Sequence, residues 1–148
     1  NYTKENFGRN HPAGALGKKL LVKVSDLMHT GDANALVSEG SSLRSAIVEM
    51  SAKGLSMVTI VDGSGKLKGI ITDGDLRRML EKGVDVYNET IDAVMTKNPK
   101  WIDSREMAVN ALQKMSDLRI TGMPVLDENG IVTGSILMQD IFKAGIVR

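Results

Sequence analysis

The sequence has no cysteine, only two histidines and few aromatic residues. Without cysteine there is no disulfide framework and no thiolate that could bind a metal or act as a nucleophile, so we expect a cytoplasmic protein. With His11 and His29 as the two histidines, a transition-metal site is not expected either. No apolar run approaches the roughly 20 residues that span a bilayer, and the first residues lack the apolar stretch of a signal peptide. We expect neither membrane insertion nor export.

The charge balance lacks a strong excess of one sign. The net charge is +1, but residues 1–24 carry +4, so residues 25–148 sum to −3. Nucleic-acid binding normally shows a basic stripe with stacking aromatics, and this chain has neither, so no nucleic-acid partner is expected. A chain of 148 residues with 42% hydrophobic content suits one compact domain or two intimately fused small ones.

An internal repeat is present. Shifting the sequence by 65 positions superimposes residues 46–77 on residues 111–142 without a gap. Upstream, residues 24–28 align with residues 91–95 at an offset of 67. Two copies predict a pseudo-twofold pair, because a solenoid usually needs three or more repeats. Eight identical pairs carry the match, namely Ala46/Ala111, Met50/Met115, Ser51/Ser116, Asp62/Asp127, Gly65/Gly130, Gly69/Gly134, Ile71/Ile136 and Asp75/Asp140.

Each copy has the pattern β-α-β-β-α. The first copy predicts a strand near residues 35–37, a helix that starts at Ser41 or Ser42 and ends at Gly54, a hairpin over 55–61 and 67–72, and a helix over 75–81. The second predicts a strand near 100–102, a helix capped by Asp103 and Glu106, a hairpin over 122–126 and 131–137, and a helix over 140–144. This is an α/β (α+β) fold with two sheets packed face to face and two clefts between the copies.

The hairpin-to-helix junction carries a family resemblance. Residues 69–75 read GIITDGD, and together with the starts at Met28 and Met95 and the repeat they resemble tandem cystathionine-β-synthase-type (CBS) domains over residues 22–147. The resemblance implies that this junction binds a nucleotide. The repeats divide the chain into CBS repeat 1 at residues 23–88 and CBS repeat 2 at residues 89–148.

A closer resemblance is to the arabinose-5-phosphate isomerases, carried by residues 11–17 (HPAGALG), 26–32 (DLMHTGD) and 72–78 (TDGDLRR). That family interconverts ribulose 5-phosphate and arabinose 5-phosphate for synthesis of the lipopolysaccharide sugar Kdo. Its members join an N-terminal sugar-isomerase domain to a CBS pair and are usually tetramers. The resemblance implies that residues 1–22 are the tail of such a domain and that His11 is an isomerase active-site residue, although Ala13 departs from the motif. No catalytic residue or cofactor is expected in the CBS pair itself.

The candidate ligand-binding residues lie where strands end. The Thr72 hydroxyl and the free N–H groups of the following helix would bind a phosphate, and Asp75, with Asp73 beside it, would accept hydrogen bonds from ribose. The competing interpretation is helix capping, for which Thr and Asp are favoured whatever the function. Further candidates are His29 and Thr30 at the mouth of the cleft, Val37 and Met57 against a base, and Arg119, with Arg77 and Arg78, against an anion.

The second copy lacks the equivalent hydroxyl, because Leu137, Met138 and Gln139 precede Asp140. We therefore expect one principal site, around Thr72, with Asp140 reduced to a cap or a weak contact. The leading hypothesis is a regulatory module whose effector, CMP-Kdo or an adenine nucleotide, biases an attached isomerase domain. The alternative is a structural module that drives oligomerisation, as a homodimer of CBS pairs, without a ligand.

Overall fold

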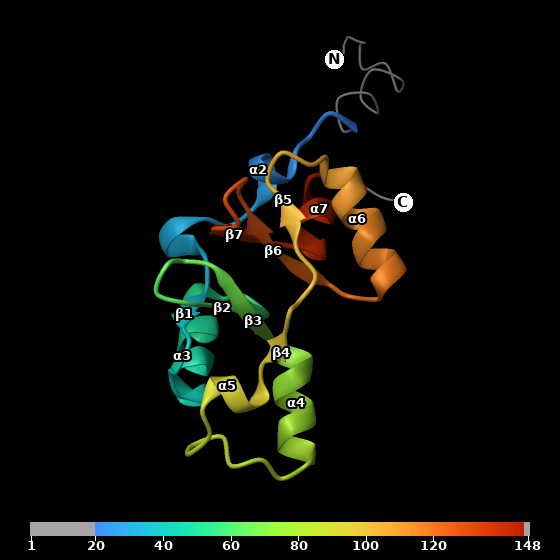
Figure 1. The fold of residues 1–148 in the computed structure, drawn as a ribbon. Coiled ribbons are helices and arrows are strands. Elements are labelled where there is room, and N and C mark those ends of the chain that lie inside the picture. Colours follow the sequence, from blue (N-terminus) through green and yellow to red (C-terminus); the bar gives the residue numbers. More distant parts are fainter. Residues whose placement is uncertain (1–19, 147–148) are drawn as a thin grey trace.

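Two small mixed sheets form the frame of the computed structural model, which describes residues 20–146 (Figure 1). The first sheet has the order β1-β2-β3-β4 and the second has the order β5-β6-β7. In each sheet a short strand runs parallel to the first strand of an antiparallel hairpin. The strands are β1 (Leu36–Ser38), β2 (Met57–Val61), β3 (Leu67–Thr72), β4 (Thr96–Lys97), β5 (Ile102–Asp103), β6 (Gly122–Leu126) and β7 (Val132–Leu137).

The helices follow the expected repeat, and the predicted fold class is confirmed. They are α2 (Val24–Leu27), η1 (Gly31–Ala33), α3 (Leu43–Lys53), α4 (Asp73–Glu81), α5 (Ile91–Val94), α6 (Ala108–Leu118) and α7 (Met138–Lys143). The long helix α3 has the predicted ends. The Ser42 hydroxyl accepts a hydrogen bond from the Ser45 N–H at 3.1 Å, and Gly54 ends the helix in the left-handed region.

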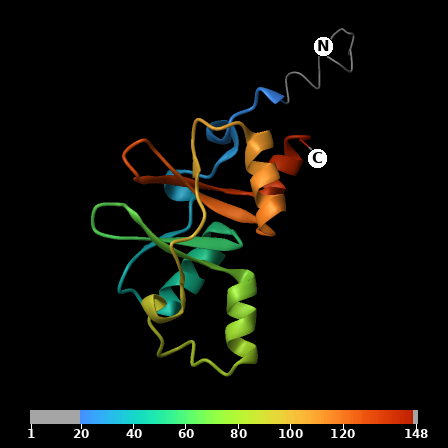
Figure 2. The ribbon, with the colours of Figure 1, turned by 45° about the vertical axis from the view of Figure 1, so that its right-hand side comes forward.

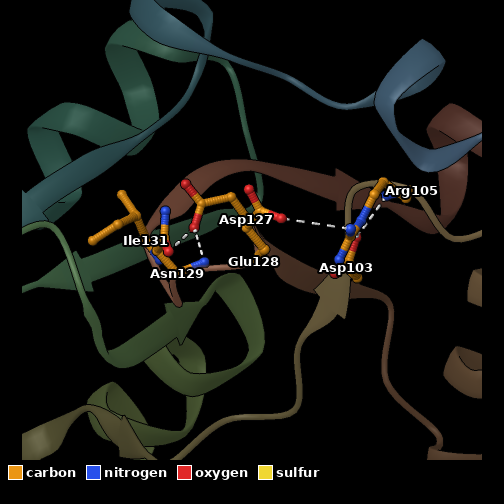
Figure 3. A network of polar contacts seen from close by, with 6 residues as sticks. All are labelled: Asp103, Arg105, Asp127, Glu128, Asn129 and Ile131. Atoms are coloured by element: carbon orange, nitrogen blue, oxygen red, sulfur yellow. Dashed lines mark hydrogen bonds and ion pairs between the residues drawn. The ribbon is translucent and has the colours of Figure 1, made fainter.

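The start of α6 differs from the prediction. It begins at Ala108, and neither Asp103 nor Glu106 caps it. The Asp103 carboxylate instead accepts hydrogen bonds from the backbone N–H and the guanidinium of Arg105, which also lies 3.8 Å from Glu128 (Figure 3). These bonds lower the pKa of Asp103 from 3.8 to about 2. The carboxylate therefore binds Arg105, which lies two residues after the end of β5, and does not cap the helix.

The first sheet has four strands where three were expected. The additional strand β4 lies on the free edge of β3, where Gly69 pairs with Lys97 and Ile70 pairs with Thr96. The β3 backbone comes very close to its neighbour here, because a Cβ at Gly69 would lie only 2.8 Å from the Thr96 carbonyl oxygen. The absence of a side chain at Gly69 therefore permits the extra strand.

The segments that lead into each repeat cross to the other half. Val24 of α2 is fully buried in the core of the second half, where α2 contacts α6. Ile91 of α5 is fully buried in the core of the first half. His29 forms an antiparallel bridge with Ser135 on β7. Each core is thus completed by the first residues of the other repeat, so the two structural halves are not simple consecutive segments of the chain.

The two sheets pack on each other as predicted. All five residues of β2 are buried, since helices cover one face of the strand and the second half covers the other. Leu137 of β7 lies in the core of the first half, and the hairpin turns meet where the Val132 N–H donates to the Gly65 carbonyl at 2.9 Å. Figure 2 shows the two hairpins stacked. No helix within residues 20–146 is long and apolar enough to cross a bilayer. His11 lies outside the described residues.

Candidate functional site: a basic cleft at the start of α4

A cavity of about 560 Å³ opens beside the start of α4. Its wall is built from both halves and from residues 98–101, which connect β4 to β5 and which we call the linker. The lining residues are Ser56, Ile70, Thr72, Asp73, Gly74, Asp75, Arg77, Arg78, Thr96, Asn98, Pro99, Lys100, Arg119, Ile120, Thr121 and Gly122. We call this cavity the basic cleft. Of the sequence-based candidates, it brings together Thr72, Asp73, Asp75, Arg77, Arg78 and Arg119.

Thr72 and Asp75 form a reciprocal cap at the start of α4. The Thr72 hydroxyl accepts a hydrogen bond from the Asp75 N–H at 3.2 Å, and the Asp75 Oδ2 accepts one from the Thr72 N–H at 2.9 Å. The second carboxylate oxygen, Oδ1, pairs with Arg78 at 2.6 Å. Capping and ligand binding are therefore not exclusive alternatives at this site, because the same residues cap the helix and face the cavity.

Positive charge dominates the basic cleft. Four cationic side chains line it, namely Arg77, Arg78, Lys100 and Arg119, against the two carboxylates of Asp73 and Asp75. They come from α4, the linker and the end of α6. The body of the chain is net negative, so this concentration of cations is local. Together with the Gly74 N–H at the start of α4, it provides a favourable environment for a phosphate. The Asp73 and Asp75 N–H groups are already engaged, by the Ser56 carbonyl and the Thr72 hydroxyl.

His29 and Thr30 do not line the basic cleft. The His29 Nε2 lies 2.9 Å from the Asp140 Oδ1 at the start of α7, and the His29 backbone pairs with Ser135. These residues therefore lie at the equivalent junction of the second half. Met57 is 2% exposed and lies in the core of the first half, next to Gly122. Val37 packs against the same core. Contact between a base and either residue stays a prediction.

The junction in the second half is organised differently. The Asp140 Oδ2 accepts a hydrogen bond from the Leu137 N–H at 2.8 Å, which repeats the cap at Thr72, but Leu137 has no hydroxyl to return it. Leu137 is 2% exposed and belongs to the core of the first half. Both oxygens of Asp140 are engaged, one by the backbone and one by His29. Asp140 acts as a cap, as expected.

Several lining residues had not been identified from the sequence, above all Lys100 and Thr121. Lys100 lies in the linker, where nothing in the local pattern marks it as part of a binding site. Ser56 and Thr121 are equivalent positions of the repeat, immediately before β2 and β6, and this offers a weak signal for both. Their carbonyls accept the Asp73 and Met138 N–H groups at 2.9 and 2.8 Å. Within residues 20–146 no three His, Asp or Glu side chains lie together as a metal site requires.

The two paired α/β repeats, with a cleft at one hairpin-to-helix junction, define a tandem-repeat α/β fold, and comparison with known proteins identifies its family. The family model described as "CBS domain" matches residues 24–82 and 91–146. The chain therefore belongs to the CBS domain family and carries two such domains in tandem.

Curated relatives include the arabinose 5-phosphate isomerase KdsD of Pseudomonas aeruginosa, 44% identical over 146 residues, and that of Escherichia coli K12, 42% identical over 146 residues. These alignments cover 99% of this chain but only 45% and 44% of the two relatives. The chain thus spans less than half the length of the isomerases that it resembles.

Among solved structures, the CBS domain pair of protein MJ0100, in complex with 5′-methylthioadenosine and S-adenosyl-L-methionine, superimposes with a TM-score of 0.74 and 28% identity, covering 83% of this chain and 94% of that one. The CBS domain protein PAE2072 from Pyrobaculum aerophilum, complexed with AMP, gives a TM-score of 0.73 at 15% identity, covering 80% of this chain and 89% of that one. The second likeness concerns the fold alone.

Proposed function

We propose that this CBS pair binds a nucleotide or sugar nucleotide in the basic cleft and thereby regulates a sugar-isomerase domain that acts on arabinose 5-phosphate. The observation that carries the proposal is the convergence of four cations and a helix start on one cavity of about 560 Å³. A volume of this size suits a small molecule. The bound adenosine compounds of the 28% identical MJ0100 pair support a nucleotide, and the KdsD relatives support the isomerase.

In this proposal each group in the basic cleft has a role. The Gly74 N–H at the start of α4 and the guanidinium of Arg119 bind the phosphate, with Arg77 and Lys100 adding positive charge. The neighbouring Asp73 and Asp75 N–H groups already donate to the Ser56 carbonyl and the Thr72 hydroxyl. The Asp75 carboxylate accepts from ribose hydroxyls when Arg78, 61% exposed, moves from it to the phosphate. We propose CMP-Kdo as the physiological effector, since an activated end product is a suitable feedback signal in the cytoplasm.

The test is a calorimetric titration with CMP-Kdo, CMP, AMP and ATP, supported by thermal unfolding. A ligand at a hundred times its dissociation constant should add about 2.7 kcal/mol to stability. Arg119→Gln should weaken binding about tenfold, because it removes a charge-assisted hydrogen bond to phosphate. Arg105→Gln, which removes an exposed arginine outside the basic cleft, is the matched control and should bind normally.

The cap residue needs its own control. Thr72→Ala removes a helix cap as well as a cleft hydroxyl, so it lowers stability even without a ligand. Ser42→Ala removes the equivalent cap of α3 outside the basic cleft. Loss of binding in Thr72→Ala alone supports the proposal. Equal binding in both variants, or no saturable heat with any nucleotide, contradicts it.

A purely structural role is the second candidate. It is supported by two large apolar side chains exposed on the terminal helices of the repeats, Leu80 on α4 at 63% and Phe142 on α7 at 46%. In this proposal the pairs associate as homodimers through these helices, and a full-length isomerase assembles further into a tetramer. Light scattering of the Leu80→Ser and Phe142→Ser variants tests it, since a monomeric wild-type chain would contradict this role.

A further inference from the structure

A second cavity, of about 550 Å³, lies beside the only tryptophan of the chain. It shares residues 98–100 of the linker with the basic cleft, and its other walls are different. The lining residues are Lys66, Leu67, Asn98, Pro99, Lys100, Trp101, Lys114, Leu126 and Gly130. We call it the tryptophan pocket. Its volume is again that of a site for a small molecule rather than for a macromolecule.

The indole of Trp101 is 46% exposed, which is a large exposure for this side chain. Lys114 lies beside Trp101: its Nζ donates a hydrogen bond to the Trp101 backbone carbonyl at 2.7 Å and lies 6.0 Å from the centre of the ring. The ammonium group has three N–H donors, so the bond to the carbonyl leaves two for another acceptor. The pocket therefore presents an exposed aromatic side chain next to a cation that can accept a further partner.

The charge lining the tryptophan pocket has one sign. Three lysines, Lys66, Lys100 and Lys114, line it, and no carboxylate is among the lining residues. Within residues 20–146, the ion pairs that the structure contains involve none of these three lysines. A concave surface with charge of a single sign concentrates the field and attracts an anion. The apolar surface comes from the indole, Leu67 and Leu126.

We infer that the tryptophan pocket binds a small anionic sugar, either a sugar phosphate or a sugar acid. The C–H face of a sugar ring packs on an aromatic face while its hydroxyls stay available for hydrogen bonds. Asn98 supplies an amide donor and acceptor for those hydroxyls, and the lysines bind the phosphate or carboxylate. This site adjoins the proposed nucleotide site and shares residues 98–100 with it, but the inference does not depend on that proposal.

Because Trp101 is the only tryptophan, its fluorescence reports binding directly. The experiment titrates the chain with arabinose 5-phosphate and with glucuronate, and in parallel with neutral arabinose and inorganic phosphate. We expect a saturable change in emission with at least one of the two anionic sugars. Arabinose and inorganic phosphate should each bind at least about tenfold more weakly, because each retains only one of the two interactions. Saturation with arabinose 5-phosphate alone identifies a sugar-phosphate site, and saturation with glucuronate alone identifies a sugar-acid site.

The matched variants are Lys66→Met, which removes a lining charge, and Lys143→Met, which removes an exposed charge on α7 outside the pocket. Lys66→Met should weaken sugar binding about tenfold while Lys143→Met leaves it unchanged. Trp101→Phe, followed by calorimetry, should also weaken it.

No saturable change with either anionic sugar overturns the inference, as does inorganic phosphate that binds as tightly as the sugar phosphate. Arg119→Gln separates the two sites. It should weaken nucleotide binding in the basic cleft and leave the tryptophan signal with anionic sugars intact, so failure of one proposal is distinguishable from failure of the other.

Discussion

The two hairpin-to-helix junctions start from the same topology and reach opposite outcomes. At the first, Thr72 and Asp75 cap α4 reciprocally and face an open cavity with four cations. At the second, Leu137 is buried in the core and the Asp140 carboxylate is occupied by His29. The first junction, with a threonine at this position, is polar and faces solvent, whereas the second, with a leucine, is apolar and packed. In this pseudo-twofold fold, one copy of the junction lines a cleft and the other packs the two halves of the molecule together.

The role of Leu137 gives the largest expected effect. Because it is 2% exposed and packs across the interface between the halves, Leu137→Ala should lower the free energy of unfolding by about 3 kcal/mol. Urea denaturation measures this. Val48→Ala, which truncates a side chain that is 59% exposed on α3, is the control and should change stability by less than about 0.5 kcal/mol. A similar small loss for Leu137→Ala would show that the second junction is not a packing element.

The pairing of His29 with Asp140 gives the next effect. His29→Ala leaves the Asp140 carboxylate, only 10% exposed, without its side-chain partner and should cost about 1.5 kcal/mol. A double-mutant cycle in an Asp140→Ala background checks the cause, since the cost of His29→Ala should shrink there. An undiminished cost would mean that His29 acts through its other contacts. Nucleotide binding in the basic cleft should not change, because His29 does not line it.

The cap at the first junction should contribute less. Thr72→Ala removes the acceptor of the Asp75 N–H and should lower stability by about 1 kcal/mol. Thr72→Ser keeps the hydroxyl and should recover most of that loss. Thermal unfolding without a ligand measures both variants. If Thr72→Ser were as unstable as Thr72→Ala, the methyl group rather than the cap would be responsible.

The smallest effect concerns a charge pair found in one half only. Asp103 ends β5, whereas the equivalent residue of β1 is the uncharged Ser38. Hydrogen bonds from Arg105 hold the pKa of Asp103 at about 2 instead of 3.8, so its stabilisation is present above 3.8 and is lost as the pH falls toward 2. Arg105→Ala should therefore be slightly less stable than wild type at neutral pH, with the difference fading over that window. Acid titration of unfolding checks this, and Asp103→Asn should abolish the difference.

Much of the fold could be predicted because its signals are local. The repeat located both hairpins, and the turn residues Asp62 and Asp127 do what their type favours, with each carboxylate accepting two N–H groups of its own turn. Ser42 and Gly54 marked the ends of α3 correctly. The error at Asp103 has the same origin, since an acidic residue three positions before a glutamate fits a capping box as well as a turn that binds Arg105.

The candidate site could be predicted only in part. Thr72 and Asp75 were identified because a strand end followed by a helix start is visible in the sequence, whereas Lys100 and Thr121 face the same cavity from segments with no such mark. His29 was placed at the wrong junction, because the chain around it crosses to the second half and its partner Asp140 lies 111 residues away.

The sequence by itself therefore determined the repeat, both hairpins with their turns, the ends of α3, and the loss of the hydroxyl at Leu137. These depend on side-chain periodicity and on hydrogen bonds that span a few residues. Only the tertiary structure decided that β4 adds a fourth strand, that Lys100 lines the open junction, that His29 pairs with Asp140, and that the sole tryptophan borders a lysine-lined pocket. Those outcomes depend on how two sheets and their exchanged leading segments pack, and contacts between residues far apart in the chain leave no local pattern to read.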